Sequence, residues 1–279
     1  MDARPLSFFA TATSGELRLG SPNAMVARVV TDSRDVRPGD LFVALKGERF
    51  DAHDFLADVA ARGAVAVVVA RDQLAKLPAG LPAIVVADTK AAYGQMAAAY
   101  RAQFDLPVVC VGGSNGKTTT KEILAAVLMR RFATLKSEAS FNNDVGVPAT
   151  LLRLEVTHQV AVLEAGTNHP GELAPLVEMI APQIGIITSI GREHLEFFGD
   201  LASVAAEEGS LAELLPSAKE GGVLVLRDFN DDGIFELATL TTTDSSMLLS
   251  AYDSQTGSIL FANTPYSRSF NQNPPRSFG

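Results

Sequence analysis

The stretch Val108-Val-Cys-Val-Gly-Gly-Ser-Asn-Gly-Lys-Thr-Thr-Thr120 decides the fold of this chain. Its first four residues form an apolar, largely β-branched run that predicts a buried strand of a parallel sheet. Glycines follow, and from Thr118 onward the apolar residues recur at helical spacing. A strand, a glycine-rich turn and a helix N-terminus form a cradle for an anion, because backbone N–H groups and the positive end of the helix dipole converge there. The stretch therefore predicts a nucleotide-phosphate site.

Four residues of this turn have expected roles. Gly113 and Gly116 let the backbone approach a phosphate, Lys117 supplies a point charge, and Thr118 offers a hydroxyl to Mg²⁺. The usual P-loop has four residues between its glycines, whereas two residues separate Gly113 from Gly116 here. The alternative is a chance Gly-Lys-Thr in an ordinary strand-to-helix turn, and the strand and helix predicted on either side favour the phosphate site.

Composition restricts the class of protein. The 279 residues suffice for two domains, and 47% hydrophobic with 20% charged residues is typical of a soluble globular protein. A net charge of -9 argues against nucleic acid or an anionic membrane as partner. Cys110 is the single cysteine, so no internal disulfide can form, and its place in the predicted strand makes it a core residue. Without a recognisable signal peptide or membrane span, we expect a cytoplasmic protein.

The chain alternates short strands and helices up to about residue 226. Residues 1–104 form one predicted domain, which ends in a helix from Thr89, its expected N-cap, to about Gln103. A second domain starts at residue 105 and has a loop at 137–148. Ligands of an open parallel sheet sit at the carboxyl ends of its strands. Because the P-loop, Glu164 with Asn168, and His194 each follow a predicted strand, we expect them to face one crevice.

Several ordered motifs resemble the Mur ligases, the ATP-dependent amide-forming enzymes of peptidoglycan precursor synthesis, and most closely the type that adds D-alanyl-D-alanine. The resemblance covers about residues 25–226. The motifs that carry it are Thr31–Arg34 (TDSR), Gly39–Gly47 (GDLFVALKG), Asp51–Phe55 (DAHDF), Gly113–Glu122 (GSNGKTTTKE), Phe141–Pro148 (FNNDVGVP), Glu164–Glu172 (EAGTNHPGE) and Ile190–Glu196 (IGREHLE).

The resemblance implies an α/β fold class: a small N-terminal α/β domain followed by a P-loop parallel-sheet central domain, with the C-terminal domain of the family missing. Residues 1–104 would be the UDP-sugar-binding N-terminal domain. Residues 105–226 would be an incomplete ATP-binding central domain, and residues 227–279 an unrelated tail.

The resemblance also gives positions their roles. Lys117, Glu164, Asn168 and His194 would be catalytic. ATP would be held by Gly112, Gly113, Ser114, Asn115, Gly116, Lys117 and Thr118, together with Asn142 and Asn143. Ser33, Arg34, Lys46 and Gly47 would bind the UDP part of the sugar nucleotide. The Mg²⁺ ligands would be Thr118, Glu164, His194 and Glu208.

Glu208 marks a departure from the family, because many relatives have there a lysine that carries a metal-bridging carbamate. We expect Glu208 to replace that carbamate directly. Simpler interpretations remain for three of the sites. Glu164 could be a solvated cap at a strand end, His194 could cap its helix, and Ser33 with Arg34 could be an ordinary turn with a salt bridge.

The implied function is ATP-dependent addition of D-alanyl-D-alanine to UDP-N-acetylmuramoyl-tripeptide, with ATP and Mg²⁺ as cofactors. The expected protein is a cytoplasmic monomer without nucleic acid or membrane partners. The missing domain would impair this activity, so the alternative is a non-catalytic remnant that binds UDP-sugar or ATP.

The tail has a character of its own. Asp228-Phe-Asn-Asp-Asp-Gly-Ile-Phe-Glu236 has the spacing of a calcium loop, although an acidic turn between strands would look similar. Residues 227 to about 262 resemble one FG-GAP-type repeat of a calcium-binding β-propeller, and residues 271–279 are expected to be unstructured. A fusion, a frameshift or a sequence-assembly error near residue 226 would explain the change. A secreted calcium-binding repeat protein is the remaining alternative, and it depends on the tail alone.

Overall fold

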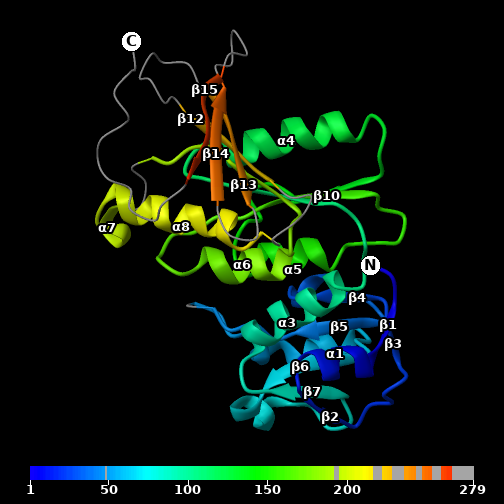
Figure 1. Ribbon diagram of the computed structural model, residues 1–279. Helices are drawn as coiled ribbons and strands as arrows, with labels where there is room; N and C mark the ends of the chain where they lie inside the picture. The colour runs from blue at the N-terminus through cyan, green and yellow to red at the C-terminus, as the bar shows by residue number, and fades with distance from the viewer. Residues whose placement is uncertain are drawn as a thin grey trace. The chain divides into compact units, whose positions relative to one another are not determined.

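The computed structural model describes residues 1–47, 49–191 and 195–215, and beyond these the backbone of four strands. The chain divides into two compact units: residues 1–105 with 144–158, and residues 106–143 with 159–279. Each unit has its own main sheet (Figure 1). The predicted calcium loop up to residue 235 and the segment 271–279 lie outside the described residues.

The sheet of the first unit has the strand order β2-β7-β6-β5-β4. Strands β4 to β7 run parallel because helical segments connect β5 to β6 and β6 to β7, while β2 is antiparallel to β7. A short pair, β1 with β3, stands apart from it. The elements are β1 (Arg4–Pro5), α1 (Leu6–Ala12), β2 (Glu16–Arg18), β3 (Met25–Val26), β4 (Arg28–Val30), η1 (Ser33–Asp35), β5 (Asp40–Val43), η2 (Ala52–Phe55), α2 (Leu56–Ala61), β6 (Ala66–Ala70), η3 (Arg71–Lys76), β7 (Ala83–Val86) and α3 (Thr89–Arg101).

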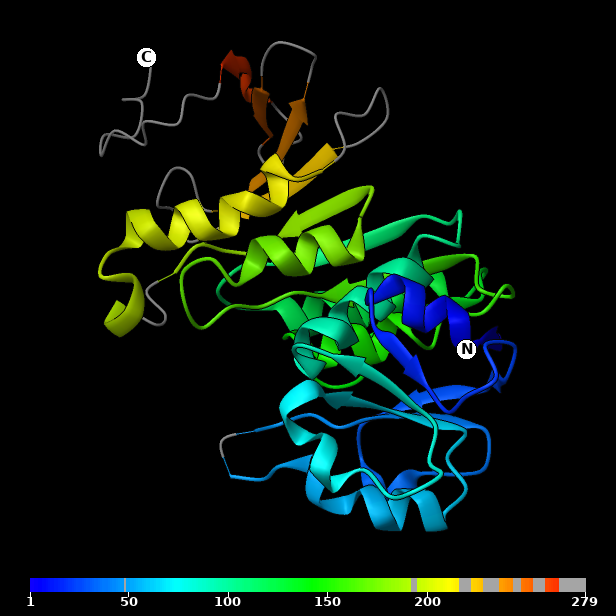
Figure 2. The same ribbon diagram turned by 90° about the horizontal axis from the view of Figure 1, so that it is seen from below.

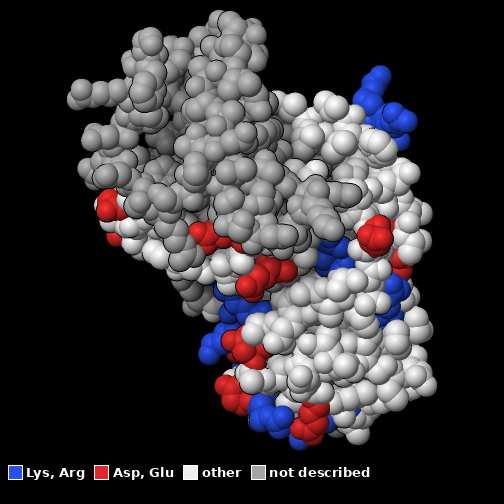
Figure 3. All heavy atoms as spheres, in the orientation of Figure 1, with Lys and Arg blue, Asp and Glu red and all other residues white. Residues whose placement is uncertain are grey.

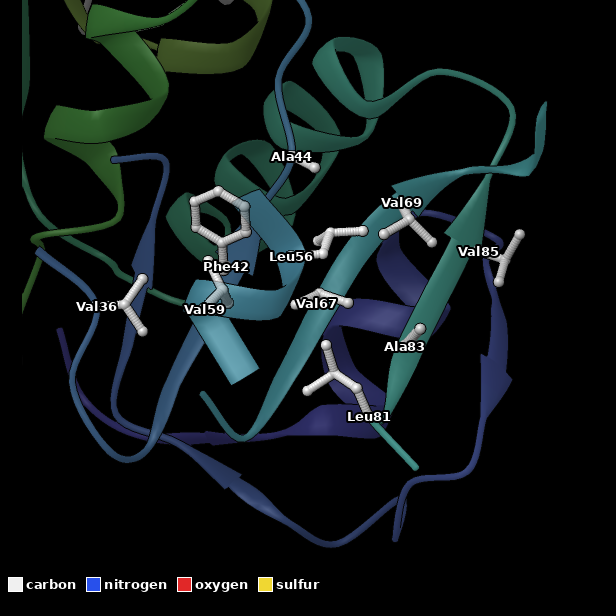
Figure 4. Close-up of a cluster of buried hydrophobic side chains, with 10 residues drawn as sticks. All are labelled: Val36, Phe42, Ala44, Leu56, Val59, Val67, Val69, Leu81, Ala83 and Val85. Atoms are coloured by element: carbon white, nitrogen blue, oxygen red, sulfur yellow. The ribbon is translucent and has the colours of Figure 1, made fainter. Parts of the chain in front are cut away.

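A cluster of apolar side chains joins α2 to this sheet (Figure 4). Leu56 and Val59 of α2 face the sheet, and neither is more than 1% exposed. The cluster consists of Val36, Phe42, Ala44, Leu56, Val59, Val67, Val69, Leu81, Ala83 and Val85. Burial of such side chains supplies the main driving force for this packing, which fixes the carboxyl ends of β4 and β5.

The start of α3 differs from the sequence-based expectation. Asp88 is the N-cap, and its carboxylate accepts hydrogen bonds from the N–H groups of Lys90 and Ala91. Thr89 is instead the first helical residue, and its buried hydroxyl donates to the Ala44 carbonyl at 2.8 Å. Both residue types cap helices, so tertiary packing decides which one does so here.

The segment 144–158 belongs to the first unit although it interrupts the second one in sequence. It contains helix α5 (Gly146–Leu151), whose first residues fall within the loop predicted at 137–148. The helix packs against α3, and the Tyr100 hydroxyl donates to the Leu154 carbonyl at 2.7 Å. A linear division at residues 104 and 105 therefore leaves the first unit incomplete and assigns 144–158 to the second unit.

The second unit contains an eight-stranded sheet in the order β15-β14-β13-β12-β11-β8-β10-β9. Strands β9, β10, β8, β11 and β12 are parallel, and β13 to β15 extend the sheet antiparallel. The parallel-sheet α/β fold predicted from the sequence is confirmed. Its elements are β8 (Val108–Gly112), α4 (Lys117–Leu128), β9 (Thr134–Lys136), β10 (Val160–Glu164), α6 (Leu173–Ile180), β11 (Ile184–Ile187), α7 (Leu195–Phe198), α8 (Leu201–Glu213), β12 (Gly222–Arg227), β13 (Glu236–Thr242), β14 (Met247–Tyr252) and β15 (Ile259–Pro265).

Helices cover both faces of this sheet: α4 lies on one face, and α6 and α8 lie on the other (Figures 1 and 2). The chain leaves β8 toward the β9 edge, and it leaves β10 in the opposite direction, toward β11. The change of direction opens a crevice at the carboxyl ends of β8 and β10, which is where open α/β sheets bind ligands.

Acidic and basic side chains are interspersed on the described part of the face drawn in Figure 3.

Of the helices that the structure describes, none has both the length and the apolar character needed to cross a membrane.

Candidate functional site

The turn between β8 and α4 forms the centre of the site. Gly113 and Gly116 adopt left-handed φ values of 109° and 87°, a region that favours glycine. At Gly113 an added Cβ would also lie 2.6 Å from Thr188 Oγ1 and 2.7 Å from Thr188 N. The backbone passes so close to the loop after β11 that only glycine fits. The first-turn N–H groups of α4, which have no acceptor within the helix, begin directly after this turn.

The loop after β11 braces the turn. The Thr188 hydroxyl donates to the Asn115 carbonyl at 2.6 Å, and the Asn115 N–H donates to Ser189 Oγ at 2.9 Å. The Ser114 N–H donates to the Ser189 carbonyl at 2.8 Å. No role was predicted for Thr188 or Ser189 from the sequence. The feature of the sequence that could have indicated this role is the pair of hydroxyl side chains beside the expected crevice.

A pocket of about 310 Å³ opens at the turn. Most of its lining was predicted as a nucleotide site, whereas Thr119 and Ser140 were not. The lining residues are Ser114, Asn115, Gly116, Lys117, Thr118, Thr119, Ser140, Asn142 and Glu164. All of them belong to the second unit.

Glu164 is the buried acid of this pocket, and its side chain is only 1% exposed. The Thr118 hydroxyl donates to Oε2 of Glu164 at 2.9 Å, and the Asn142 amide donates to Oε1 at 2.8 Å. A carboxylate and a hydroxyl oxygen side by side are hard ligands that suit Mg²⁺, so the residues present fit this ion. Within the described residues, no three or more His, Cys, Asp or Glu side chains form a metal-binding group. His194, the other expected ligand from this region, lies outside those residues.

The Lys117 ammonium lies over the turn. Its Nζ donates to the carbonyls of Gly113 at 2.5 Å and Ser114 at 2.9 Å. A positive charge at this position, together with the α4 N-terminus, makes the pocket attractive to an anion.

Glu208 lies behind the turn on α8, where it is only 2% exposed. Its Oε2 accepts a hydrogen bond from the Gly113 N–H at 2.6 Å. The neighbouring Cys110 of β8 is fully buried, as expected for a core residue. Burial, followed by the charges of Glu208 and Glu164, raises the pKa of the Cys110 thiol far above its usual range. The observed contact makes Glu208 a support of the turn, and its role as a metal ligand stays a prediction.

Asn168 lies in the loop after β10, and this loop is organised by Glu172. The backbone N–H groups of Asn168 and His169 donate to Glu172 Oε2 at 2.9 and 3.1 Å. Asn168 and Asn143 are not among the residues that line the described pocket, so their catalytic and nucleotide roles stay predictions.

The residues predicted to bind UDP lie in the first unit, at the carboxyl ends of two adjacent parallel strands. Ser33 and Arg34 follow β4 in η1, and Lys46 with Gly47 follows β5. The Arg34 guanidinium donates to Asp32 Oδ2 at 2.6 Å and lowers the pKa of that carboxyl to about 2. The Arg34 side chain is 86% exposed, so it can still reach a ligand.

Comparison with protein families gives two matches. Residues 26–101 match the "Mur ligase family, catalytic domain", and residues 111–263 match the "Mur ligase middle domain". The second match continues beyond Leu226, where the resemblance was expected to end, and it includes strands β13 and β14, which extend the central sheet.

Curated relatives carry the name UDP-N-acetylmuramoyl-tripeptide--D-alanyl-D-alanine ligase. The Escherichia coli protein is 42% identical over 227 residues, which cover 81% of this chain and 48% of that protein. The Bacillus subtilis protein is 38% identical over 197 residues, with coverages of 71% and 42%. The chain thus spans about half the length of the curated relatives it matches.

Solved structures agree with these matches. The MurF structure from Acinetobacter baumannii has a TM-score of 0.73 at 29% identity, covering 90% of this chain and 61% of that one. MurF ligase from Thermotoga maritima, solved in complex with ADP, has a TM-score of 0.65 at 26% identity, with coverages of 81% and 58%. Since the middle-domain match alone covers more than half of the sequence, the chain belongs to the Mur ligase family.

Proposed function

We propose that this chain serves ATP-dependent amide bond formation, in which D-alanyl-D-alanine is joined to UDP-N-acetylmuramoyl-tripeptide. The observation that carries the proposal is the pocket after β8, where Lys117, Thr118, Asn142 and Glu164 line one anion-binding space. The names of the curated relatives and the ADP in the Thermotoga maritima structure support this reaction and this nucleotide.

In the proposed reaction the peptide carboxylate attacks the γ-phosphorus of ATP, which gives an acyl phosphate and ADP. The amine of the dipeptide then attacks the acyl carbon, phosphate leaves, and the amine loses a proton. The turn and the α4 N-terminus would bind the phosphates, and Lys117 would balance their charge. Thr118 and Glu164 would hold Mg²⁺, and Asn142 would orient the Glu164 carboxylate through its hydrogen bond. The bound ion would neutralise charge on the transferring phosphoryl group.

The first unit would hold the UDP-sugar. Arg34 and Lys46 are cations at the carboxyl edge of adjacent parallel strands, and such cations suit a diphosphate. This assignment depends on position and charge.

The experiment is a ligation assay followed by mass spectrometry. The chain is joined to the part of the Escherichia coli relative that its match leaves uncovered, and incubated with UDP-N-acetylmuramoyl-tripeptide, D-alanyl-D-alanine, ATP and Mg²⁺. We expect a pentapeptide product that requires all three substrates and disappears in Lys117→Ala. A fused protein that binds ATP yet forms no product would overturn the ligase proposal and favour a nucleotide-binding role alone.

A further inference from the structure

Lys121 is a fully buried cation that the proposed function does not use. It lies on α4, one helical turn after Lys117, and its side chain is 0% exposed. A buried ammonium group is costly unless hydrogen bonds and opposite charges satisfy it. The identity of its partners therefore indicates what Lys121 holds in place.

Two of the partners are backbone carbonyls of one loop. The Lys121 Nζ donates to the Ser137 carbonyl at 3.0 Å and to the Ala139 carbonyl at 2.5 Å. Ala139 has a φ of 43°, in the left-handed region that L-residues avoid. The ammonium thus fixes a carbonyl that belongs to an unfavourable backbone conformation.

This loop carries two residues of the pocket, Ser140 and Asn142. The Asn142 carbonyl accepts from the Gly166 N–H at 2.9 Å, and its amide donates to Glu164. Ser137, at the start of the loop, accepts from the Glu164 N–H through Oγ at 3.1 Å. The loop therefore holds Glu164 from both its backbone and its carboxylate side.

The remaining partners are carboxylates. Lys121 Nζ lies 3.2 Å from Glu122 Oε1 and 3.8 Å from Glu164 Oε2. Lys121 consequently both tethers the loop and balances the charge of the buried Glu164.

We propose that Lys121 is a positioning residue: it holds the loop 137–142, and through Asn142 it aligns Glu164 for the metal that accompanies ATP. This inference rests on the proposed nucleotide function. The direct electrostatic effect of removing Lys121 would be to strengthen Mg²⁺ binding, because a cation 3.8 Å from Glu164 would be lost. Loss of positioning weakens Mg²⁺ binding instead, so the sign of the change separates the two effects.

The test measures ATP affinity of the whole chain by calorimetry, first with EDTA and then with Mg²⁺, and takes the ratio as the metal-dependent gain. Lys121→Met and Lys121→Gln are expected to reduce this gain about tenfold, the order of effect seen for residues that orient metal ligands. Lys121→Arg, which keeps the charge and donors, should retain most of it. Lys136→Met is the matched control, because it also removes a cation paired with Glu122.

A second readout is a double-mutant cycle with Asn142→Ala. If Lys121 acts through Asn142, Lys121→Gln should change the gain little further in the Asn142→Ala background. The ATP affinity measured in EDTA should stay near the parent value in the Lys121 variants. This measurement reports on the nucleotide site in the absence of metal. A gain that is unchanged or larger in Lys121→Met or Lys121→Gln would overturn the inference and leave the proposed nucleotide site intact.

Discussion

Gly113 and Gly116 share a left-handed backbone but differ in their surroundings. An added Cβ at Gly113 would meet Thr188 at 2.6 Å, whereas the nearest atom at Gly116 is 3.9 Å away. We predict that Gly116→Ala destabilises the fold by about 1–2 kcal/mol, the cost of a left-handed L-residue. Gly113→Ala should cost more and should also weaken ATP binding, because the turn must move. Urea unfolding and calorimetry of the two variants check this, and equal effects would argue against the observed packing.

The Asp32 carboxylate gives a prediction about the pH dependence of stability. Arg34 lowers the pKa of Asp32 to about 2, from about 3.9 in an unfolded chain. The stabilisation by this pair is therefore complete above about pH 4, and it is lost as the pH falls through about 2. Because both side chains are exposed, the effect on stability should be small. An NMR titration should show the depressed pKa, and Arg34→Met should return it toward about 3.9; no change in that variant would contradict the pairing.

The roles of residues within the motifs could be predicted from the sequence, whereas the roles of residues that act across the fold could not. Lys117, Thr118 and Glu164 follow predicted strands, and they do line one pocket. Lys121 lies in the same motif as Lys117, but nothing in the sequence shows that it is buried against the loop at 137–142. Thr188 likewise acquires its role only because β11 lies beside β8 in the sheet.

Helix α8 contains a glycine without a visible structural need. At Gly209 an added Cβ would meet no atom of the described residues within 4 Å, and the backbone is helical. We predict that Gly209→Ala stabilises the protein by roughly 0.5–1 kcal/mol, because alanine has the higher helix propensity. Gly199→Ala is the matched control: its Cβ would also have no neighbour within 4 Å among the residues that the structure describes, but the φ of Gly199 is 79°, so no gain is expected. Denaturant midpoints measure both, and a gain in both variants would contradict the explanation.

Elements with a strong pattern were predictable, and those with a weak one were not. The β-branched run at residues 108–111 predicted β8 apart from its end, and the strand expected before Glu164 is β10. Helix α5 was missed because it begins with Gly146 and has Pro148 in its first turn, a composition that favours a loop.

The division of the molecule follows contacts in space as well as the order of the sequence. Residues 144–158 belong to the first unit, which no linear boundary can represent. We predict that Leu151→Ala, a truncation of a fully buried side chain, destabilises the first unit by about 2–5 kcal/mol. Hydrogen exchange should accelerate in α3 and in β5 to β7 and stay slow in β8 and β10. The opposite distribution would show that this segment belongs with the second unit.

We infer that the pocket after β8 binds the phosphates of ATP, and calorimetry of ATP with Mg²⁺ measures this binding. Lys117 contributes a charge at the pocket, whereas Lys136 lies on β9 and pairs with Glu122. The parent chain and Lys136→Ala should bind ATP equally, and Lys117→Ala should bind it at least about tenfold more weakly, as expected for a lost charge-assisted hydrogen bond. Equal affinity in the parent and Lys117→Ala would contradict the assignment of this pocket.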